Sequence, residues 1–299
     1  MSRSLFWRLR PACSLGDVRS GLGCSIMMAT MSLLWQPFPM PARRRAQAWR
    51  YHPAFRRPAH FHDEPEINIV VRGTATFVVG NRRVPLSAGG LVWYPPGVDH
   101  FLDDASEDLE LYVVGFRPEL LAAFARQHGT VLSFARPLAS VDEQTLRACV
   151  ETFGGAPASK DDGAVEQQLL ALLASLGGVR SVSTLGHRAV ALLVETPTLS
   201  RDDLVRRLAS NRGDVSRRFR SDQGMSLTEY KNRLQTLQLL ARLTAGQGNL
   251  MRAALEAGFG SYSRCHQVIR SLLGCAPSAL LDPEVRQLLA ERLEPFVGS

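Results

Sequence analysis

The sequence lacks the features of a disulfide-stapled, thiolate-zinc or membrane-spanning protein. Its 299 residues include only five cysteines, an odd number scattered along the chain without a close pair. Neither a disulfide framework nor a cysteine zinc site is therefore expected, and free thiols suit a reducing cytoplasm. The apolar run Ile26–Trp35 is shorter than the roughly 18 residues that a membrane span needs. We therefore predict a cytoplasmic protein without a membrane partner.

The first 50 residues resemble a targeting sequence only superficially. Arg3, Arg8 and Arg10 precede the apolar run, but no small-residue cleavage site follows it. We predict that residues 1–50 form a disordered extension, or that the chain as given starts upstream of the natural start. Both interpretations are favoured over a secretion signal.

Charge is distributed unevenly along the chain. Residues 201–270 contain 13 basic and six acidic side chains, a net charge of +7, whereas residues 51–185 contain 11 and 16, a net charge of −5. A cationic surface suits contact with phosphates, and the acidic middle would be repelled by DNA. Arginine-rich solvated helices would give the same imbalance, so charge alone does not decide.

Residues 51–116 have the pattern of short strands. Ile67–Val71 and Thr74–Val79 are β-branched runs separated by Gly73, and Gly80-Asn81 suits a hairpin turn. Further strand-like runs follow at Arg82–Val84, Gly90–Tyr94 and Leu109–Phe116. Many short strands without intervening helices predict a small antiparallel barrel or sandwich.

Residues 117–183 turn to helical periodicity. Helices are expected at Pro118–His128 and Asp142–Val150, and the segment Gly177–Ser183 is typical of an interdomain linker. Between them an apolar stripe follows helical spacing: Val165, Leu169, Leu172, Leu173 and Leu176. Such a stripe packs on its own domain or forms a homodimer contact, and both readings stay open here.

Residues 184–299 are predicted to form an all-α domain with two helix-turn-helix units. In the first, Ser200–Ala209 and Asp214–Gly224 flank a break at Ser210–Gly213. In the second, Asn249–Gly260 is followed by Ser261–Gly274. Each unit has a short amphipathic helix, a tight turn and a second helix rich in polar side chains, as needed to enter a major groove.

Three capping patterns mark helix starts within this domain: Ser200 with Asp203, Asn211 with Asp214, and Ser226 with Glu229. The last opens a helix of about 18 residues between the two units, which would span about 27 Å. A spacer of this length can place two recognition helices near the roughly 34 Å repeat of successive major grooves.

Inward-facing Val215 and Phe219 turn the other side of the first recognition helix outward. The candidate DNA-binding residues there are Arg212, Ser216, Arg217, Arg218 and Arg220. Arg217 is the candidate to contact guanine, and the other arginines are expected on phosphates. The candidates on the second recognition helix are Tyr262, Ser263, His266 and Gln267, with Gln267 suited to pair with adenine. A solvated helix face is the alternative for each of them.

The motifs of this domain resemble the AraC/XylS family of bacterial transcription regulators. The resemblance lies in Arg206–Ala209, Val215–Arg220, Gly224–Tyr230 and Ala254–Ser263. Aromatic positions of the family's second recognition helix are Cys265 and Ile269 here, Gly213 stands where a base-contacting side chain is common, and Gly274–Leu280 departs from the usual ending. These departures bear on packing and base readout, not on the fold.

The strand-rich region resembles the cupin signature. His60-Phe-His62-Asp-Glu-Pro-Glu66 is followed by Gly73, and Gly89 by Pro95-Pro-Gly97-Val-Asp-His100. The resemblance implies that His60, His62, Glu66 and His100 converge inside the barrel. Three imidazoles and a carboxylate suit a divalent transition metal such as Mn, Fe, Ni or Zn. An effector pocket without metal, and purely structural histidines, are the alternatives.

Two further features of this region bear on the pocket. The asparagine that often ends the second motif is Asp104 here, and Trp93, Tyr94 and Phe77 are candidates to line the pocket.

Together these patterns predict a multidomain α+β protein: an N-terminal cupin-like antiparallel β-barrel and a C-terminal domain with two helix-turn-helix units. The expected divisions are 1–50, 51–116, 117–183 and 184–299. The predicted function is sequence-specific transcription regulation, with activation the commoner mode of the family and a small-molecule effector in the barrel. Expected partners are promoter DNA, RNA polymerase and a second copy of the chain. No catalytic residue is assigned, and the rival is a metal-dependent cupin enzyme fused to a DNA-binding module.

Overall fold

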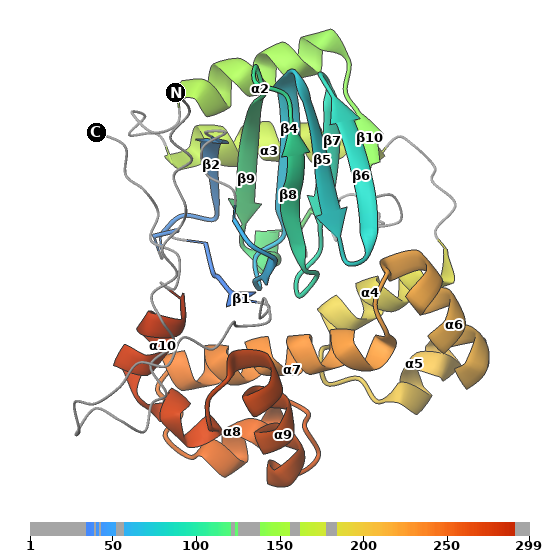
Figure 1. Ribbon diagram of the computed structural model, residues 1–299, viewed down its shortest axis with the longest axis vertical. Coiled ribbons are helices and arrows are strands. Elements are labelled where there is room, and N and C mark those ends of the chain that lie inside the picture. Colours follow the sequence, from blue (N-terminus) through green and yellow to red (C-terminus); the bar gives the residue numbers. More distant parts are fainter. Residues whose placement is uncertain are drawn as a thin grey trace, which may run out of the picture.

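The computed structural model describes residues 34–38, 40–41, 43–51, 57–120, 123–124, 138–155, 162–177 and 184–290. A barrel of two sheets lies above a helical unit, and the long helix α7 (Leu227–Thr244) runs beneath the barrel (Figure 1). Most of the expected extension, most of the helix Pro118–His128 and the linker residues 178–183 lie outside the described residues. No helix in the described part of the chain is long and apolar enough to cross a membrane.

The barrel consists of two five-stranded sheets. One has the order β1 (Leu34–Trp35), β3 (His60–Phe61), β8 (His100–Ala105), β5 (Thr74–Val79) and β6 (Arg82–Ser87). The other has the order β10 (Leu138–Ser140), β7 (Gly90–Tyr94), β4 (Glu66–Arg72), β9 (Glu110–Phe116) and β2 (Ala46–Tyr51). All pairs are antiparallel except β1 with β3. The predicted strands and the antiparallel barrel are confirmed.

The barrel includes segments outside the predicted range 51–116. β2 begins at Ala46 and pairs with β9 over six residues, and β10 pairs with β7 from within the expected helical region. In β2 the buried positions are the small residues Ala46 and Ala48, so its hydrophobic alternation is faint in the sequence. β10 has only three residues, too few for a periodic signal.

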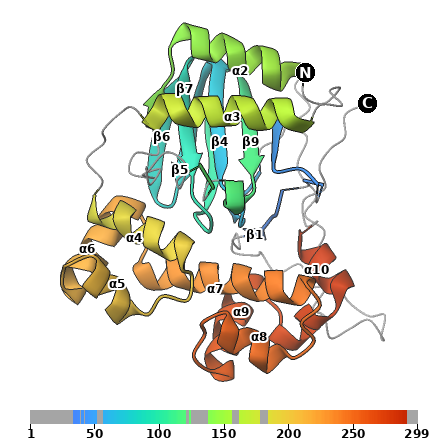
Figure 2. The ribbon, with the colours of Figure 1, turned by 180° about the vertical axis from the view of Figure 1, so that it is seen from behind.

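Two helices cover the outer face of the second sheet. These are α2 (Glu143–Gly155) and α3 (Asp162–Gly177), which cross the strands in Figure 2. Four residues of the apolar stripe of α3 lie in the apolar core: Val165, Leu169, Leu172 and Leu173 are at most 7% exposed within a single chain. Because these four residues are buried within one chain, the stripe packs on its own domain, and Leu176 at its end is half-buried.

The C-terminal unit has the two predicted helix-turn-helix pairs. After α4 (Leu185–Glu195), the first pair is α5 (Arg201–Arg207) and α6 (Arg212–Gln223). Beyond α7 the second pair is α8 (Leu250–Glu256) and α9 (Tyr262–Leu273), followed by a 3-10 helix (Pro277–Leu281) and α10 (Pro283–Ala290). Gly224 and Gly274 end α6 and α9 in the left-handed conformation that glycine adopts without strain.

All three predicted helix starts are confirmed by side-chain caps. The side chains of Ser200, Asn211 and Ser226 each accept a hydrogen bond from the backbone N–H three residues on. At Ser226 the bond is reciprocal, because Glu229 Oε2 accepts from the Ser226 N–H at 2.7 Å. These caps satisfy N–H groups that have no partner inside the helix.

We expect Ser226→Ala to lower the free energy of unfolding by about 0.5–2 kcal/mol, because the N-cap oxygen of α7 is lost. The control is Ser221→Ala, an exposed position on α6 without a cap role, where a change within about 0.5 kcal/mol is expected. Urea unfolding measures both. Equal effects would show that the cap does not stabilise α7.

The second unit packs without the aromatic residues of the family pattern. Cys265 and Ile269 are fully buried in a separate apolar cluster that also contains Phe259 and Leu280. Leu255 is 49% exposed, since Ala253 and Ala254 occupy the inward positions of α8. The departures in sequence are thus accommodated by smaller residues in the same core.

Candidate functional site

Four side chains from three places in the sequence meet inside the barrel. His60 lies on β3, His62 just after it, Glu66 at the start of β4 and His100 at the start of β8. His60 and His100 face one another across paired strands. One nitrogen or oxygen of each of the four lies within 4.8 Å of those of the others, and all four side chains are buried. The predicted convergence of these residues is therefore present in the fold.

Backbone carbonyls orient three imidazole rings. His60 Nδ1 lies 2.9 Å from Pro58 O, His62 Nδ1 lies 2.7 Å from Glu64 O, and His100 Nδ1 lies 3.0 Å from Val98 O. A ring nitrogen that donates to a carbonyl leaves Nε2 as the coordinating atom. The Nε2 atoms of His62 and His100 are indeed 3.0 and 3.2 Å from Glu66 Oε2.

The electrostatics favour an ionised carboxylate among histidines. Burial alone would raise the pKa of Glu66, but His100 and His62 hold it well below its usual value. Burial, with the nearby charges of His100 and His62, lowers the pKa of His60 well below its usual value. Burial would also lower the pKa of His62, but its hydrogen bond to Glu66 raises that pKa overall. The site therefore provides one anion and a neutral imidazole, both competent ligands.

The donor set fits a divalent transition metal. Mn, Fe, Ni and Zn accept ligand sets of three imidazoles and one carboxylate. The second nitrogen of each imidazole is held here by a backbone carbonyl, as is usual for histidines that bind metals. Such a metal would replace the contacts that Nε2 of His62 and of His100 now make with Glu66. It would supply positions at which a small ligand could bind.

The aromatic residues predicted to line this site divide between the two faces of the sheet. Tyr94 stacks on His100 with ring centroids 4.0 Å apart, and Phe77 meets Tyr94 edge-on at 6.1 Å. Trp93 instead packs on Phe116 at 5.6 Å, because successive residues of a strand point to opposite faces. Trp93 therefore does not line the site.

Three further residues bear on the motif or on a ligand. Asp104, which replaces the motif's asparagine, is exposed on β8 and lies outside the cluster. Phe38 lies 4.8 Å from the His62 ring, although its segment was expected to be disordered. Asn68 donates to Tyr94 Oη at 3.3 Å, and its buried Oδ1 has no hydrogen-bond partner among the described residues. An unpaired buried oxygen, linked through Tyr94 to His100 of the cluster, is what a ligand would satisfy.

The outer face of α6 carries the predicted arginines. Arg212, Ser216, Arg217, Arg218 and Arg220 are all exposed, while Val215 and Phe219 are buried as expected. Arg217 forms an ion pair with Asp214, and Arg212 pairs with Asp202 at 2.6 Å. Exposed pairs of this kind are weak, so both guanidinium groups can exchange onto nucleic acid at little cost.

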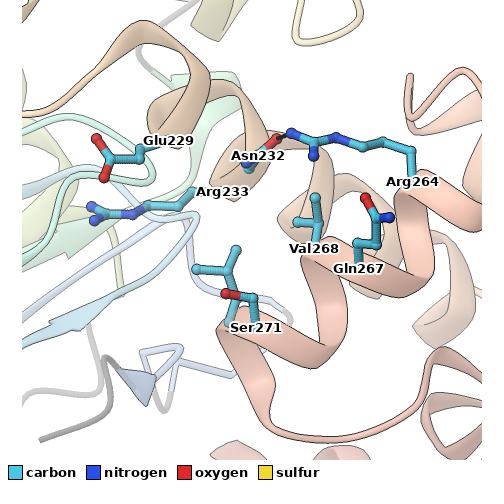
Figure 3. A pocket seen from close by; sticks show the side chains of 8 residues that line it. Glu229, Asn232, Arg233, Arg264, Gln267, Val268 and Ser271 are labelled. Atoms are coloured by element: carbon cyan, nitrogen blue, oxygen red, sulfur yellow. Dashed lines mark hydrogen bonds between the residues drawn. The ribbon is translucent and has the colours of Figure 1, made fainter. Parts of the chain in front are cut away.

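Of the candidate residues on α9, Gln267 lines a pocket of about 260 Å³ between α9 and α7, and the other three do not. Ser263 and Gln267 are exposed, and Tyr262 and His266 are half-buried. Figure 3 shows Gln267 and Arg264 on one wall, with Arg264 donating to Asn232 Oδ1 of α7 at 3.1 Å. Arg264 was not among the predicted residues, although its exposure and charge on a recognition helix suit DNA.

The comparisons with known proteins match both parts of the chain. The model of the AraC-like ligand binding domain matches residues 44–195, and a helix-turn-helix domain model matches residues 204–282. An uncharacterized protein of Streptomyces coelicolor, SCO3923, is 38% identical over 58 residues, which cover 19% of this chain and 55% of that protein. The chain thus spans about half the length of this curated relative.

Two solved structures are similar at low identity. ToxT from Vibrio cholerae is 13% identical with a TM-score of 0.43, over 80% of this chain and 98% of that one. The AraC-like transcriptional activator CuxR is also 13% identical, with a TM-score of 0.30, over 66% and 74%.

A ligand-binding barrel followed by two helix-turn-helix units defines a sensor joined to a DNA-binding domain. The family model of the barrel covers half of the chain and is followed by the helix-turn-helix match. The chain belongs to the AraC family, with an AraC-like ligand binding domain followed by a helix-turn-helix domain.

Proposed function

We propose that this chain regulates transcription by binding promoter DNA through α6 and α9, under control of a small-molecule effector held at a metal in the barrel. The observation that carries the proposal is the buried set His60, His62, Glu66 and His100, which shares one chain with two helix-turn-helix units. Arg212, Arg218 and Arg220 are proposed to hold phosphates, and Arg217 and Gln267 to contact bases.

We also propose a mode of transcription regulation and the partners of the chain. We propose activation, through contact with RNA polymerase, by a homodimer in the cytoplasm. The stripe of α3 no longer supports the homodimer, because it is buried within one chain. Light scattering of the purified chain, with and without promoter DNA, tests the oligomeric state.

The test of the proposal is binding of the full chain to DNA that flanks its own gene, measured across a salt series with competitor DNA. Because arginines on phosphates release counterions, the logarithm of affinity is expected to fall linearly with the logarithm of salt concentration. One segment should be retained at competitor levels that remove the others. Equal, weak binding to every segment, with or without divalent metal, would contradict it.

A metal-dependent enzyme is the second candidate, because the same cluster of three histidines and a glutamate suits catalysis at a metal. Turnover of a candidate small-molecule substrate by the metal-loaded chain would favour it. The regulator proposal instead expects such a compound to change DNA affinity and to be recovered unchanged.

A further inference from the structure

The loop between β7 and β8, residues 95–99, contacts both the His/Glu cluster of the barrel and the DNA-binding unit. On the barrel side, the Gly97 N–H donates to His62 O at 2.9 Å, and Val98 O lies 3.0 Å from His100 Nδ1. The same five residues therefore fix the positions of two members of the cluster. His100 directly follows the loop in the chain.

On its other side this loop packs on α7. Tyr230 Oη donates to Pro96 O at 2.9 Å, and Arg233 pairs with Asp99 and donates to Gly97 O at 3.4 Å. Tyr230 is fully buried, and the Arg233 side chain is only 11% exposed. A Cβ at Gly97 would lie 3.2 Å from Leu234 Cδ2, so loop and helix are in close contact.

Arg233 also reaches the strand that carries the cluster. Its guanidinium carbon lies 5.9 Å from the ring centre of Phe61, the residue between His60 and His62. In Figure 3 Arg233 extends from α7 toward the barrel, whereas the opposite wall of the pocket belongs to α9. The helix that carries Arg233 lies between the two helix-turn-helix units in the chain.

We propose that Tyr230 and Arg233 are positioning residues that couple the cluster to the DNA-binding unit through the 95–99 loop. A metal bound by His62 and His100 would stiffen this loop and hold α7 against the barrel. Linkage makes the coupling reciprocal: loss of the α7 contacts must weaken metal binding by the same factor that metal strengthens those contacts. The proposal rests on the proposed metal site and assigns its route of signalling.

The test is the affinity of the full chain for Ni²⁺ alone, by calorimetry, in Arg233→Met and Tyr230→Phe. Neither residue is a candidate ligand, yet each substitution is expected to weaken Ni²⁺ binding about 5-fold or more, the lower end of the usual coupling between sites. The control is Arg242→Met on the same helix, whose partner is Glu256 within the DNA-binding unit at 2.9 Å. It is expected to leave the affinity unchanged, and equal affinities in all variants would overturn the proposal.

Hydrogen exchange separates this inference from the metal proposal. In the wild type, Ni²⁺ is expected to slow exchange of residues 226–240, and Arg233→Met to remove that protection. If the wild type binds no Ni²⁺, the proposed metal site is contradicted. Hydrogen exchange measured without metal then tests the loop contact by itself. Faster exchange of residues 95–104 in Arg233→Met and Tyr230→Phe than in Arg242→Met would then support the contact, and no difference would overturn it. Tyr230→Phe keeps the buried ring, so it removes the hydrogen bond with little risk to folding.

Discussion

Glu66→Gln is expected to abolish tight binding of divalent transition metal by the barrel. Glu66 is the only carboxylate of the cluster among the described residues, and its Oε2 accepts from His62 and His100. The amide removes the negative charge that offsets the metal's charge while it keeps the size of the side chain. The affinity for the metal should fall by more than the factor of about 10 to 100 that removal of a supporting hydrogen bond costs.

Asp104→Asn is the matched control for this prediction. It makes the same change of charge on an exposed residue of β8, and it restores the asparagine of the cupin motif. We expect its metal content after purification without chelator to equal that of the wild type. The proposed metal site would be contradicted by a wild type that carries no metal and takes up none. Equal loss of metal in both variants would contradict it as well.

Arg217→Ala is expected to weaken binding to the specific DNA segment by about 1–3 kcal/mol and to relax the preference at one base pair. Arg217 is exposed on α6, and its present partner Asp214 is on the same helix. Arg218→Ala is the control, because a phosphate contact should weaken binding to all sequences alike and reduce the salt dependence by about one ion. Selection of binding sites from random DNA measures both. An unchanged sequence preference in Arg217→Ala would contradict the assignment of Arg217 to a base contact.

The sequence was most informative where spacing and chemistry coincide. The helix starts at Ser200, Asn211 and Ser226 were predictable, because a capping oxygen and a residue three positions on are a local pattern. The convergence of His60 and His100 followed from the resemblance to the cupin motif, and the register of β3 with β8 confirms it.

Other features depend on contacts that no local pattern encodes. β2 was missed because its buried residues are alanines, and β10 because it is three residues long. Trp93 was misplaced because a short apolar run does not tell which face of a strand points inward. The hydrogen bond from Tyr230 to Pro96 joins residues 134 positions apart, so only the folded chain shows that α7 contacts the site.

The central claim is that occupancy of the barrel controls the DNA-binding unit. Its most direct test is the affinity of the wild type and of Glu66→Gln for the same specific DNA segment, with and without Ni²⁺ at a fixed salt concentration. Ni²⁺ is expected to change the DNA affinity of the wild type by about 5- to 150-fold, the usual range of coupling between sites, and to leave that of Glu66→Gln unchanged. An identical DNA affinity with and without Ni²⁺, in a wild type shown by calorimetry to have bound the metal, would contradict it.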